Sequence, residues 1–415
     1  MKTRVNWDSL LLRPASERYV PVADGLRALC VGVVMWFHIW QQSWLNPSIL
    51  GEDFNWLVRS GYMLVEPLLT LSGFLLFLPW ARAAVSGAPS PSARAFYKKR
   101  AVRILPSYLL CVFVMLFCVA LPQHQYASSA EMWKDLLTHL TFTNVFFPAS
   151  YTYTHLNVVL WTVTIEVQFY LLFPLLARAF RKYPLLTYAA MTAAALVFRF
   201  GYAARLSDTT HVLNQLPAML DVFANGMLAA YAYQAAARSF KPNRAASALL
   251  TLVSVACIYG VCQLIRAQTL AGSGDYTALR LGQMQRRYAV SFLTSIFLVS
   301  ASHALRPFQF LFGNRVMRFL SSVSFQAYIW HHPLALQLKY WRFPAYSAPS
   351  NPQFYSETVW QRHYTLVCFL GALLLATLVT YLFEKPLARL FLRGEKKRTG
   401  DVSCQPVHPQ TEDEA

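Results

Sequence analysis

The sequence predicts an all-α, polytopic membrane protein with about ten transmembrane helices and both termini on the cytoplasmic side. Three observations lead to this fold class. The 415 residues are 56% hydrophobic and only 13% charged, against roughly a quarter charged for an ordinary soluble domain. Near-continuous apolar runs recur along the chain, each about 17–25 residues long, which is enough to cross a bilayer. Lysine and arginine are concentrated in alternate connections between these runs.

The ten runs are expected to follow one another along the chain, with two long outer connections. They lie near residues 26–43, 61–80, 102–121, 157–177, 184–202, 216–236, 246–265, 288–304, 318–338 and 364–384. An even number of spans puts both termini on one side. That side carries 26 of the 37 lysines and arginines, and the opposite side carries 11. Because positive charge favours cytoplasmic connections, we expect both termini in the cytoplasm.

The connections indicate where a site would be covered. Two predicted outer loops, 122–156 and 339–363, are long and rich in Tyr, Phe, Pro and Ser, as loops that form binding sites often are. A third outer loop, 266–287, carries four arginines against the general charge pattern. We predict one integral-membrane domain over residues 1–393, with an uncleaved first span, and a disordered cytoplasmic tail over 394–415.

Composition also excludes several classes of function. The net charge of +18 lies largely in short loops between apolar runs, so it does not point to nucleic acid. Six of the seven cysteines fall within apolar runs, where they are expected to act as small hydrophobic residues. Cys404 falls in the polar tail. No CxxC motif or Cys/His cluster predicts a metal site.

The first run carries Arg27 and His38, eleven residues apart. A separation of eleven at about 100° per residue returns to nearly the same helix face, about 16 Å further along the axis. An arginine at the membrane edge with a histidine above it can hold an anion at the surface and transfer protons within the bilayer. The alternative is a snorkelling arginine and a structural histidine.

Several acids interrupt later apolar runs: Glu66, Glu166 and Asp221. Each is costly in lipid, so each is expected to face the bundle interior or a wet cavity. The alternative is that an acid pairs with an arginine to hold helices together, which applies to Asp221 above all.

Basic residues and histidines mark two further segments. Arg100 and Arg103 belong to a cluster of five basic residues over 94–103. Such a cluster is typical of a lipid-facing loop, and it is also what a polyphosphate ligand from the cytosol requires. His331 and His332 are adjacent, and side chains about 100° apart are not expected to serve one site. We expect one of them to form a hydrogen bond across helices.

Five segments together resemble the integral-membrane acyltransferase 3 family, over about residues 19–390. They are DGLRALCVGVVMWFH, EPLLTLSGFLL, FYKKRAVRILPSY, WTVTIEVQFYLLFPL and VSFQAYIWHHPL. The chain departs from the family pattern in three motif positions: Glu66 stands for the usual Asp, Val167 for a second acid, and Phe325 for a tyrosine.

The resemblance implies transfer of an acyl group, most often acetyl, from cytosolic acyl-CoA to a hydroxyl of an extracytoplasmic glycan, in the bacterial cell membrane. The CoA phosphates would dock on Arg27, Arg100 and Arg103. His38 would act as general base or as transient acyl carrier. Glu66 or Glu166 would orient its imidazole and stabilise the cation. No metal is implied, and the sequence carries no signal for acyl length or oligomeric state.

Two other classes of function fit part of the pattern. A proton-coupled transporter or a flippase for lipid-linked substrates would also use intramembrane acids and a histidine, although no internal repeat supports it. A catalytically inactive membrane scaffold is the third reading. Aromatic residues of the two long outer loops would suit stacking on sugar rings in an acceptor: Tyr151, Tyr153, Trp341 and Trp360.

Overall fold

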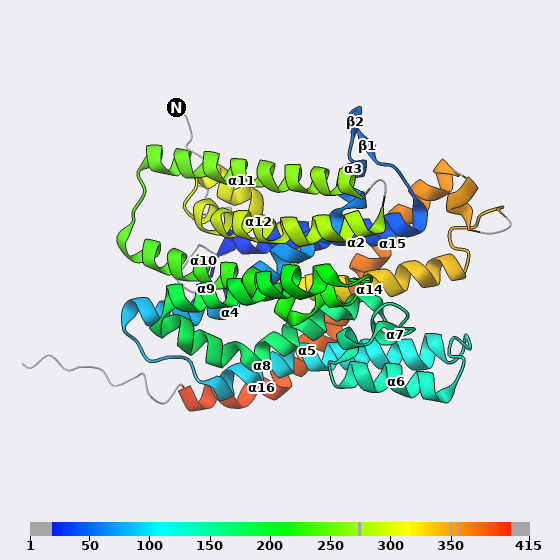
Figure 1. Ribbon diagram of the computed structural model, residues 1–415, viewed down its shortest axis with the longest axis horizontal. Coiled ribbons are helices and arrows are strands. Elements are labelled where there is room, and N and C mark those ends of the chain that lie inside the picture. Colours follow the sequence, from blue (N-terminus) through cyan, green and yellow to red (C-terminus); the bar gives the residue numbers. More distant parts are fainter. Residues whose placement is uncertain (1–18, 273–274, 349–350, 356, 400–415) are drawn as a thin grey trace, which may run out of the picture.

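The computed structural model describes residues 19–399, except 273–274, 349–350 and 356. It is almost entirely helical, with one small antiparallel hairpin of strands β1 (Ser48–Ile49) and β2 (Glu52–Asp53). The all-α prediction is therefore confirmed. Most of the long helices run roughly along the longest axis of the molecule (Figure 1).

Every predicted apolar run forms a helix. The long helices are α2 (Pro21–Ser43), α4 (Val65–Ser86), α5 (Ala93–Val114), α8 (Trp161–Lys182), α9 (Pro184–Leu196), α10 (Leu220–Ser239), α11 (Arg244–Ala271), α12 (Tyr276–Ser302), α14 (Arg315–Tyr340), α15 (Thr358–Val379) and α16 (Lys385–Thr399). The shorter ones are α3 (Asn55–Arg59), α6 (Ser129–Leu140), α7 (Pro148–Tyr151) and α13 (Arg306–Gly313).

Single turns of other helix types extend several of these helices. The 3₁₀ turns lie at Gly61–Leu64, Asn144–Phe146, Val158–Leu160, Ala203–Arg205, Val212–Asn214, Leu216–Met219 and Pro352–Tyr355. The π turns lie at Met115–Ala120, Val197–Tyr202 and Thr380–Glu384.

The described residues include seven helices that are long and apolar enough to cross a membrane, or eight if α12 and α13–α14, bent by 118°, form one span. The chain is a multi-pass membrane protein. The predicted count of about ten is not confirmed. The runs in α10, α12 and α14 carry acids, arginines or histidines, which lower their mean hydropathy.

The connections gather at two ends of the bundle, in the two groups predicted from the sequence. The links from α4 to α5 and from α10 to α11, and the end of α16, lie at the left of Figure 1. The β hairpin, α6 and α7 lie toward the right. The side of the membrane that each end faces stays a prediction.

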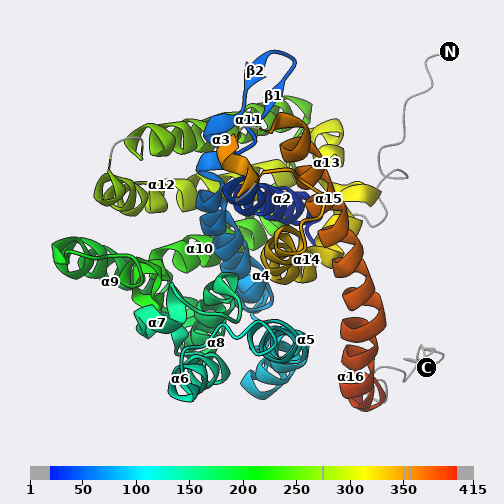
Figure 2. The ribbon, with the colours of Figure 1, turned by 90° about the vertical axis from the view of Figure 1, so that its right-hand side faces the viewer.

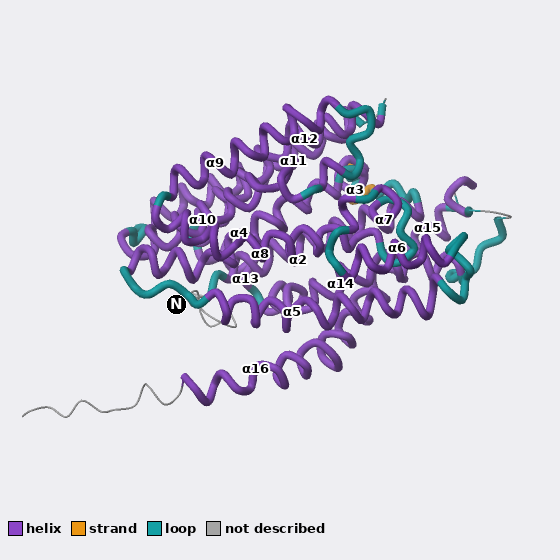
Figure 3. Tube along the Cα trace, turned by 60° about the horizontal axis from the view of Figure 1, so that its bottom comes forward, coloured by secondary structure: helices purple, strands orange, loops and turns teal. Residues whose placement is uncertain are grey.

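Two predicted boundaries differ from the structure. The predicted loop 266–287 consists mostly of helix, because α11 continues to Ala271 and α12 begins at Tyr276. Helix α16 lies at the periphery (Figure 3) and extends to Thr399, past the predicted domain boundary at residue 393. Residues 400–415, including Cys404, lie outside the described residues.

Close helix packing explains two glycines in the core. A Cβ on Gly226 of α10 would lie 2.0 Å from the Thr70 carbonyl oxygen of α4, and one on Gly73 would lie 2.5 Å from the Phe223 carbonyl oxygen. Small residues of this kind allow membrane helices to approach closely. Because one face of α4 packs tightly on α10, the opposite face of α4 is available to line the candidate site. Seen end-on, α2 lies centrally, between α4, α14 and α15 (Figure 2).

Candidate functional site

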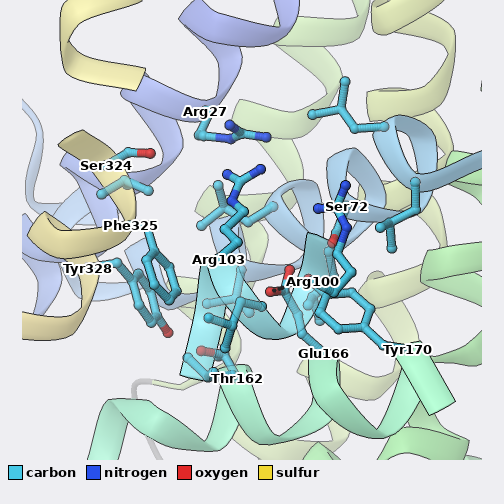
Figure 4. Close-up of a pocket in the computed structure, with 18 residues that line it drawn as sticks. Arg27, Ser72, Arg100, Arg103, Thr162, Glu166, Tyr170, Ser324, Phe325 and Tyr328 are labelled. Atoms are coloured by element: carbon cyan, nitrogen blue, oxygen red, sulfur yellow. Dashed lines mark hydrogen bonds between the residues drawn. The ribbon is translucent and has the colours of Figure 1, made fainter. Parts of the chain in front are cut away.

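A cavity of about 150 Å³ is lined by five helices that are far apart in sequence: α2, α4, α5, α8 and α14. Each of these helices carries one of the five segments described above. Charged and hydroxyl groups lie among apolar side chains on its walls (Figure 4). The lining residues are Arg27, Val31, Val65, Leu68, Leu69, Ser72, Leu75, Leu76, Arg100, Arg103, Ile104, Thr162, Val163, Glu166, Tyr170, Ser324, Phe325 and Tyr328.

Three guanidinium groups reach this cavity. Arg27 comes from the first turns of α2, and Arg100 and Arg103 lie one turn apart on α5. Figure 4 shows the Arg27 and Arg103 groups facing the same space, with Arg100 beside them. Among the described residues, none of the three forms an ion pair within 4.0 Å. Several like charges around one space, without ion-pair partners, favour a multiply charged anion there.

The aromatic walls hold Arg100 in position. Its guanidinium carbon lies 6.0 Å from the Tyr170 ring centroid and 5.9 Å from that of Phe96. Contacts of this kind fix an arginine without neutralising its charge. The buried Nε of Arg100 has no hydrogen-bond partner within the described part of the chain, so this donor is available to a ligand oxygen.

Glu166 is the acid of this cavity. It lies on α8, and its Oε2 accepts a hydrogen bond from the Tyr170 hydroxyl at 3.1 Å. In Figure 4 the carboxylate lies between the side chains of Arg100 and Arg103. One carboxylate among three arginines leaves the cavity positive while it limits their mutual repulsion.

A cluster of three histidines lies further along the same helices. His38 belongs to α2, and His331 and His332 belong to α14. The His38 ring centroid is 5.0 Å from that of His331 and 5.2 Å from that of His332. Both neighbours therefore contact His38, contrary to the expectation that adjacent histidines would not serve one site. The reason is that His38 lies between the two rings, on the facing helix α2. His331 and His332 can therefore both contact His38 without turning toward each other.

The hydrogen bonds of the cluster assign the tautomers. His38 Nδ1 lies 3.1 Å from the Val34 carbonyl oxygen, and His331 Nδ1 lies 3.1 Å from that of Ala327. Because carbonyl oxygens only accept hydrogen bonds, both Nδ1 atoms carry the proton in the neutral rings. His331 Nε2, 2.9 Å from His38 Nδ1, then accepts a hydrogen bond across the two helices from the same N–H, which it shares with the Val34 carbonyl. This confirms that one histidine of the pair bonds across helices.

The remaining nitrogen of His38 is left with a lone pair. Its Nε2 makes no hydrogen bond to any residue in the described ranges, and the ring is only partly buried. A ring with Nδ1–H anchored and Nε2 unprotonated is the arrangement that a general base requires.

Glu66 lies away from both groups. Its Oε1 is 3.0 Å from the Nε of Arg287 on α12, within a fully buried ion pair. Within the described part of the chain, neither Glu66 nor Glu166 forms a hydrogen bond or an ion pair with His38. His331 thus has the position next to His38 Nδ1 that we expected a carboxylate to have, and the catalytic roles of both glutamates stay predictions.

One of the four arginines in the predicted outer loop 266–287, Arg287, has a structural role. It lies in α12 and is completely buried, with further hydrogen bonds to the Leu213 carbonyl and to Asn214. Asp221, for which an arginine partner was an open alternative, forms such a pair with Arg199 at 2.5–2.9 Å. The sequence signal for both pairs was the presence of buried acids, each of which needs a cation.

Four of the six predicted site residues lie together in the structure, and two do not. Arg27, Arg100, Arg103 and Glu166 line one cavity, whereas His38 and Glu66 are absent from its lining. Tyr170 had no predicted role, and the sequence did not distinguish His331 from His332, although all three lie within the quoted segments. In the described ranges, no group of three or more His, Cys, Asp or Glu side chains is arranged to hold a metal ion.

Comparison with known proteins identifies the family. The family model for the acyltransferase domain of the acyltransferase 3 family matches residues 21–389. The chain belongs to this family, and the predicted resemblance is confirmed. All five helices that line the cavity lie inside the matched region.

Individual relatives are distant. The chain is 23% identical over 333 residues to the O-acetyltransferase OatA of Staphylococcus aureus, covering 77% of this chain and 51% of the relative. It is 28% identical over 168 residues to the acyltransferase MdmB of Streptomyces mycarofaciens, covering 40% of this chain and 41% of the relative. It is 29% identical over 174 residues to the peptidoglycan O-acetyltransferase OatA of Listeria monocytogenes, covering 40% of this chain and 26% of the relative. The chain thus spans about half the length of these relatives or less, and no solved structure matches it.

Proposed function

We propose that this protein is an O-acyltransferase of the bacterial cell membrane. It moves an acyl group, acetyl above all, from cytosolic acyl-CoA to a hydroxyl of an extracytoplasmic glycan. One observation carries the proposal: the five segments that resemble the family come together around one cavity with three arginines. The names of the relatives, O-acetyltransferase among them, support the same chemistry.

The arginines provide the donor site. CoA carries several phosphates that cannot enter lipid, and guanidinium groups bind phosphates by charge-assisted hydrogen bonds. Arg27, Arg100 and Arg103 would hold the nucleotide end at the membrane boundary. The apolar walls beyond them, including Val31, Leu69 and Ile104, suit the less polar arm that carries the thioester.

His38 provides the base. Its Nε2 takes the proton of the acceptor hydroxyl, the hydroxyl oxygen forms a bond to the thioester carbonyl carbon, and the carbon–sulfur bond breaks. The proton then passes from His38 to the leaving CoA thiolate. His331 accepts the Nδ1–H bond and holds the ring in the required tautomer. The same Nε2 lone pair serves the alternative in which His38 carries the acyl group transiently.

The spacing along α2 suits a reaction across the membrane. The rise from Arg27 to His38 is about 16 Å at about 1.5 Å per residue, roughly half of a 30 Å hydrocarbon core. With both termini in the cytoplasm, the nucleotide stays inside while His38 meets an acceptor from outside.

The test is acyl transfer by the purified protein in lipid nanodiscs. Labelled acetyl-CoA and an envelope glycan fraction should give labelled glycan and one free CoA per ester formed. His38→Ala should abolish transfer and retain CoA binding, because it removes the base and not the donor site. Transfer by His38→Ala above about a tenth of the wild-type rate would contradict the assignment. In sealed proteoliposomes, movement of intact glycan across the membrane without ester formation would favour the transporter.

A further inference from the structure

The histidine cluster lies between two cavities. Helices α2 and α14 pack side by side (Figure 2) and run in the same direction, because Arg27 and Ser324 line the first cavity while Gln42 and Lys339 meet beyond the histidines. The second cavity therefore lies past His38, on the side away from the three arginines. It is lined in part by the last turns of the same two helices.

The second cavity is open and has a volume of about 580 Å³. It is lined by Gln42, Leu336, Lys339, Tyr340, Arg342, Tyr346 and Asn351. Gln42 lies one helical turn, about 6 Å, beyond His38 on the same face of α2. The wall of this cavity therefore begins about one helical turn beyond the proposed base.

The polar groups of this cavity are fixed by their neighbours. The Lys339 ammonium donates to the Gln42 carbonyl oxygen at 3.2 Å and to its Oε1 at 3.4 Å. Since an ammonium has three donors, one remains for a ligand. The Arg342 guanidinium lies 4.7 Å from the Tyr346 ring centroid and donates to the Ala348 carbonyl at 3.1 Å, which leaves further donors available.

The charges of the lining have one sign. It includes two cations, and no aspartate or glutamate among its described residues. Tyr340, 63% exposed, presents an aromatic surface beside Lys339. Aromatic rings with amide groups suit the faces and hydroxyls of a sugar, and the cations require a negative charge on it.

We propose that this second cavity is the acceptor site, and that the acceptor is an anionic saccharide. Its carboxylate or phosphate binds Lys339 and Arg342, while a hydroxyl of the same or the next sugar reaches His38. This inference rests on the proposed function and adds the class of the acceptor. It also explains why a cationic pocket lies at the end of the bundle opposite to the donor arginines.

The experiment compares two matched acceptors in nanodiscs of neutral lipid. One is a tetrasaccharide that contains uronic acids, and the other is the same tetrasaccharide with its carboxyls converted to primary amides. We expect kcat/KM for the acid to exceed that for the amide at least tenfold. Arg342→Gln and Lys339→Gln should each reduce this ratio severalfold, and Arg342→Glu should bring it to one or below. The control Arg362→Gln, an exposed arginine of α15 outside the cavity, should leave the ratio unchanged.

Each other outcome rejects a defined part of the proposal. Equal rates for acid and amide, with transfer to the envelope glycan fraction intact, would overturn the anionic acceptor alone. A second arm adds anionic phospholipid to the nanodiscs. If that lipid inhibits the wild type but not Arg342→Gln, the cavity binds lipid headgroups and the acceptor assignment is wrong. Absence of transfer to every acceptor, including the envelope fraction, would reject the proposed function and this inference together.

Discussion

The neighbours of His38 fix which nitrogen of its ring carries the proton. An isolated imidazole can carry its proton on either nitrogen, but the Val34 carbonyl and His331 Nε2 both select Nδ1–H. The lone pair on Nε2 is thereby directed away from α2, the helix whose Val34 carbonyl anchors the ring. A neutral partner at Nδ1 differs from the carboxylate of a hydrolase triad, because it orients the ring without a full negative charge.

His331→Ala should lower kcat about a hundredfold and leave the donor KM nearly unchanged, because it frees the His38 ring to adopt the wrong tautomer. His331→Gln should recover part of the rate, since its carbonyl oxygen can accept the Nδ1–H bond. A suitable control is His303→Ala at the C-cap of α12, because the Nδ1 of His303 also lies close to a backbone carbonyl oxygen of the preceding helix, 2.9 Å from that of Val299. Steady-state kinetics in nanodiscs measure all three. A kcat for His331→Ala within threefold of the wild type would remove His331 from the mechanism.

Arg100→Ala and Arg103→Ala should each raise the KM for acetyl-CoA roughly tenfold or more, because a hydrogen bond to a charged group contributes about 1.5–3 kcal/mol. With acetyl-pantetheine, which lacks the nucleotide, the same variants should differ little from the wild type. Arg94→Ala, an exposed arginine of the same helix outside the cavity, is the matched control. An unchanged KM with a collapsed kcat would assign these arginines to folding or to the chemical step.

At the scale of helices, buried ion pairs connect the elements around the site. Glu66 of α4 pairs with Arg287 of α12, and Asp221 of α10 pairs with Arg199 of the π turn after α9. Both arginines also donate to the Ala218 carbonyl, at 3.0 and 3.5 Å. The two pairs therefore form one network that holds α4 against α10, and the opposite side of α4 forms a wall of the cavity that the three arginines line.

Glu66→Gln should reduce the yield of folded protein, because it leaves the Arg287 charge buried without a partner, which costs about 3–5 kcal/mol. Replacing both residues, Glu66→Gln with Arg287→Gln, removes the unpaired charge and should restore most of the yield. Size-exclusion profiles in detergent and transfer rates in nanodiscs report folding and chemistry separately. We expect yield and activity to recover together. Recovered yield without activity would instead support the catalytic role that the sequence suggested for Glu66.

At the scale of the whole molecule, the cavity with the three arginines and the second cavity lie toward opposite ends of α2. A reaction between a cytosolic donor and an extracytoplasmic acceptor requires these ends to face opposite sides of the membrane. The concentration of lysine and arginine near the α4–α5 and α10–α11 connections indicates that this end is cytoplasmic.

Cysteine labelling in intact cells should separate the two ends. In a variant without native cysteines, Ala130→Cys at the start of α6 should react with a membrane-impermeant maleimide. Ala88→Cys, in the α4–α5 connection, should react only after the cells are opened. Both alanines are exposed, so the two positions differ in sidedness rather than in burial. The reverse pattern would put the arginines outside and exclude a cytosolic donor.

The sequence by itself determined the properties that depend on composition and local pattern. Apolar runs long enough to span a bilayer have to be helices, since lipid offers no partner to the backbone, and each predicted run is a helix. The five segments were enough to predict the family. Arg27 and His38 could be assigned to one helix face because helical periodicity is local.

Only the tertiary structure decided which residues meet. A sequence of helices does not specify their packing, so nothing local predicted that Glu66 would contact Arg287, more than two hundred residues away. The same is true of His331, which contacts His38 because α2 and α14 lie side by side, and of Lys339, which reaches Gln42 for the same reason. A buried charge requires a partner, and the sequence shows that requirement. The packing of the helices selects the partner.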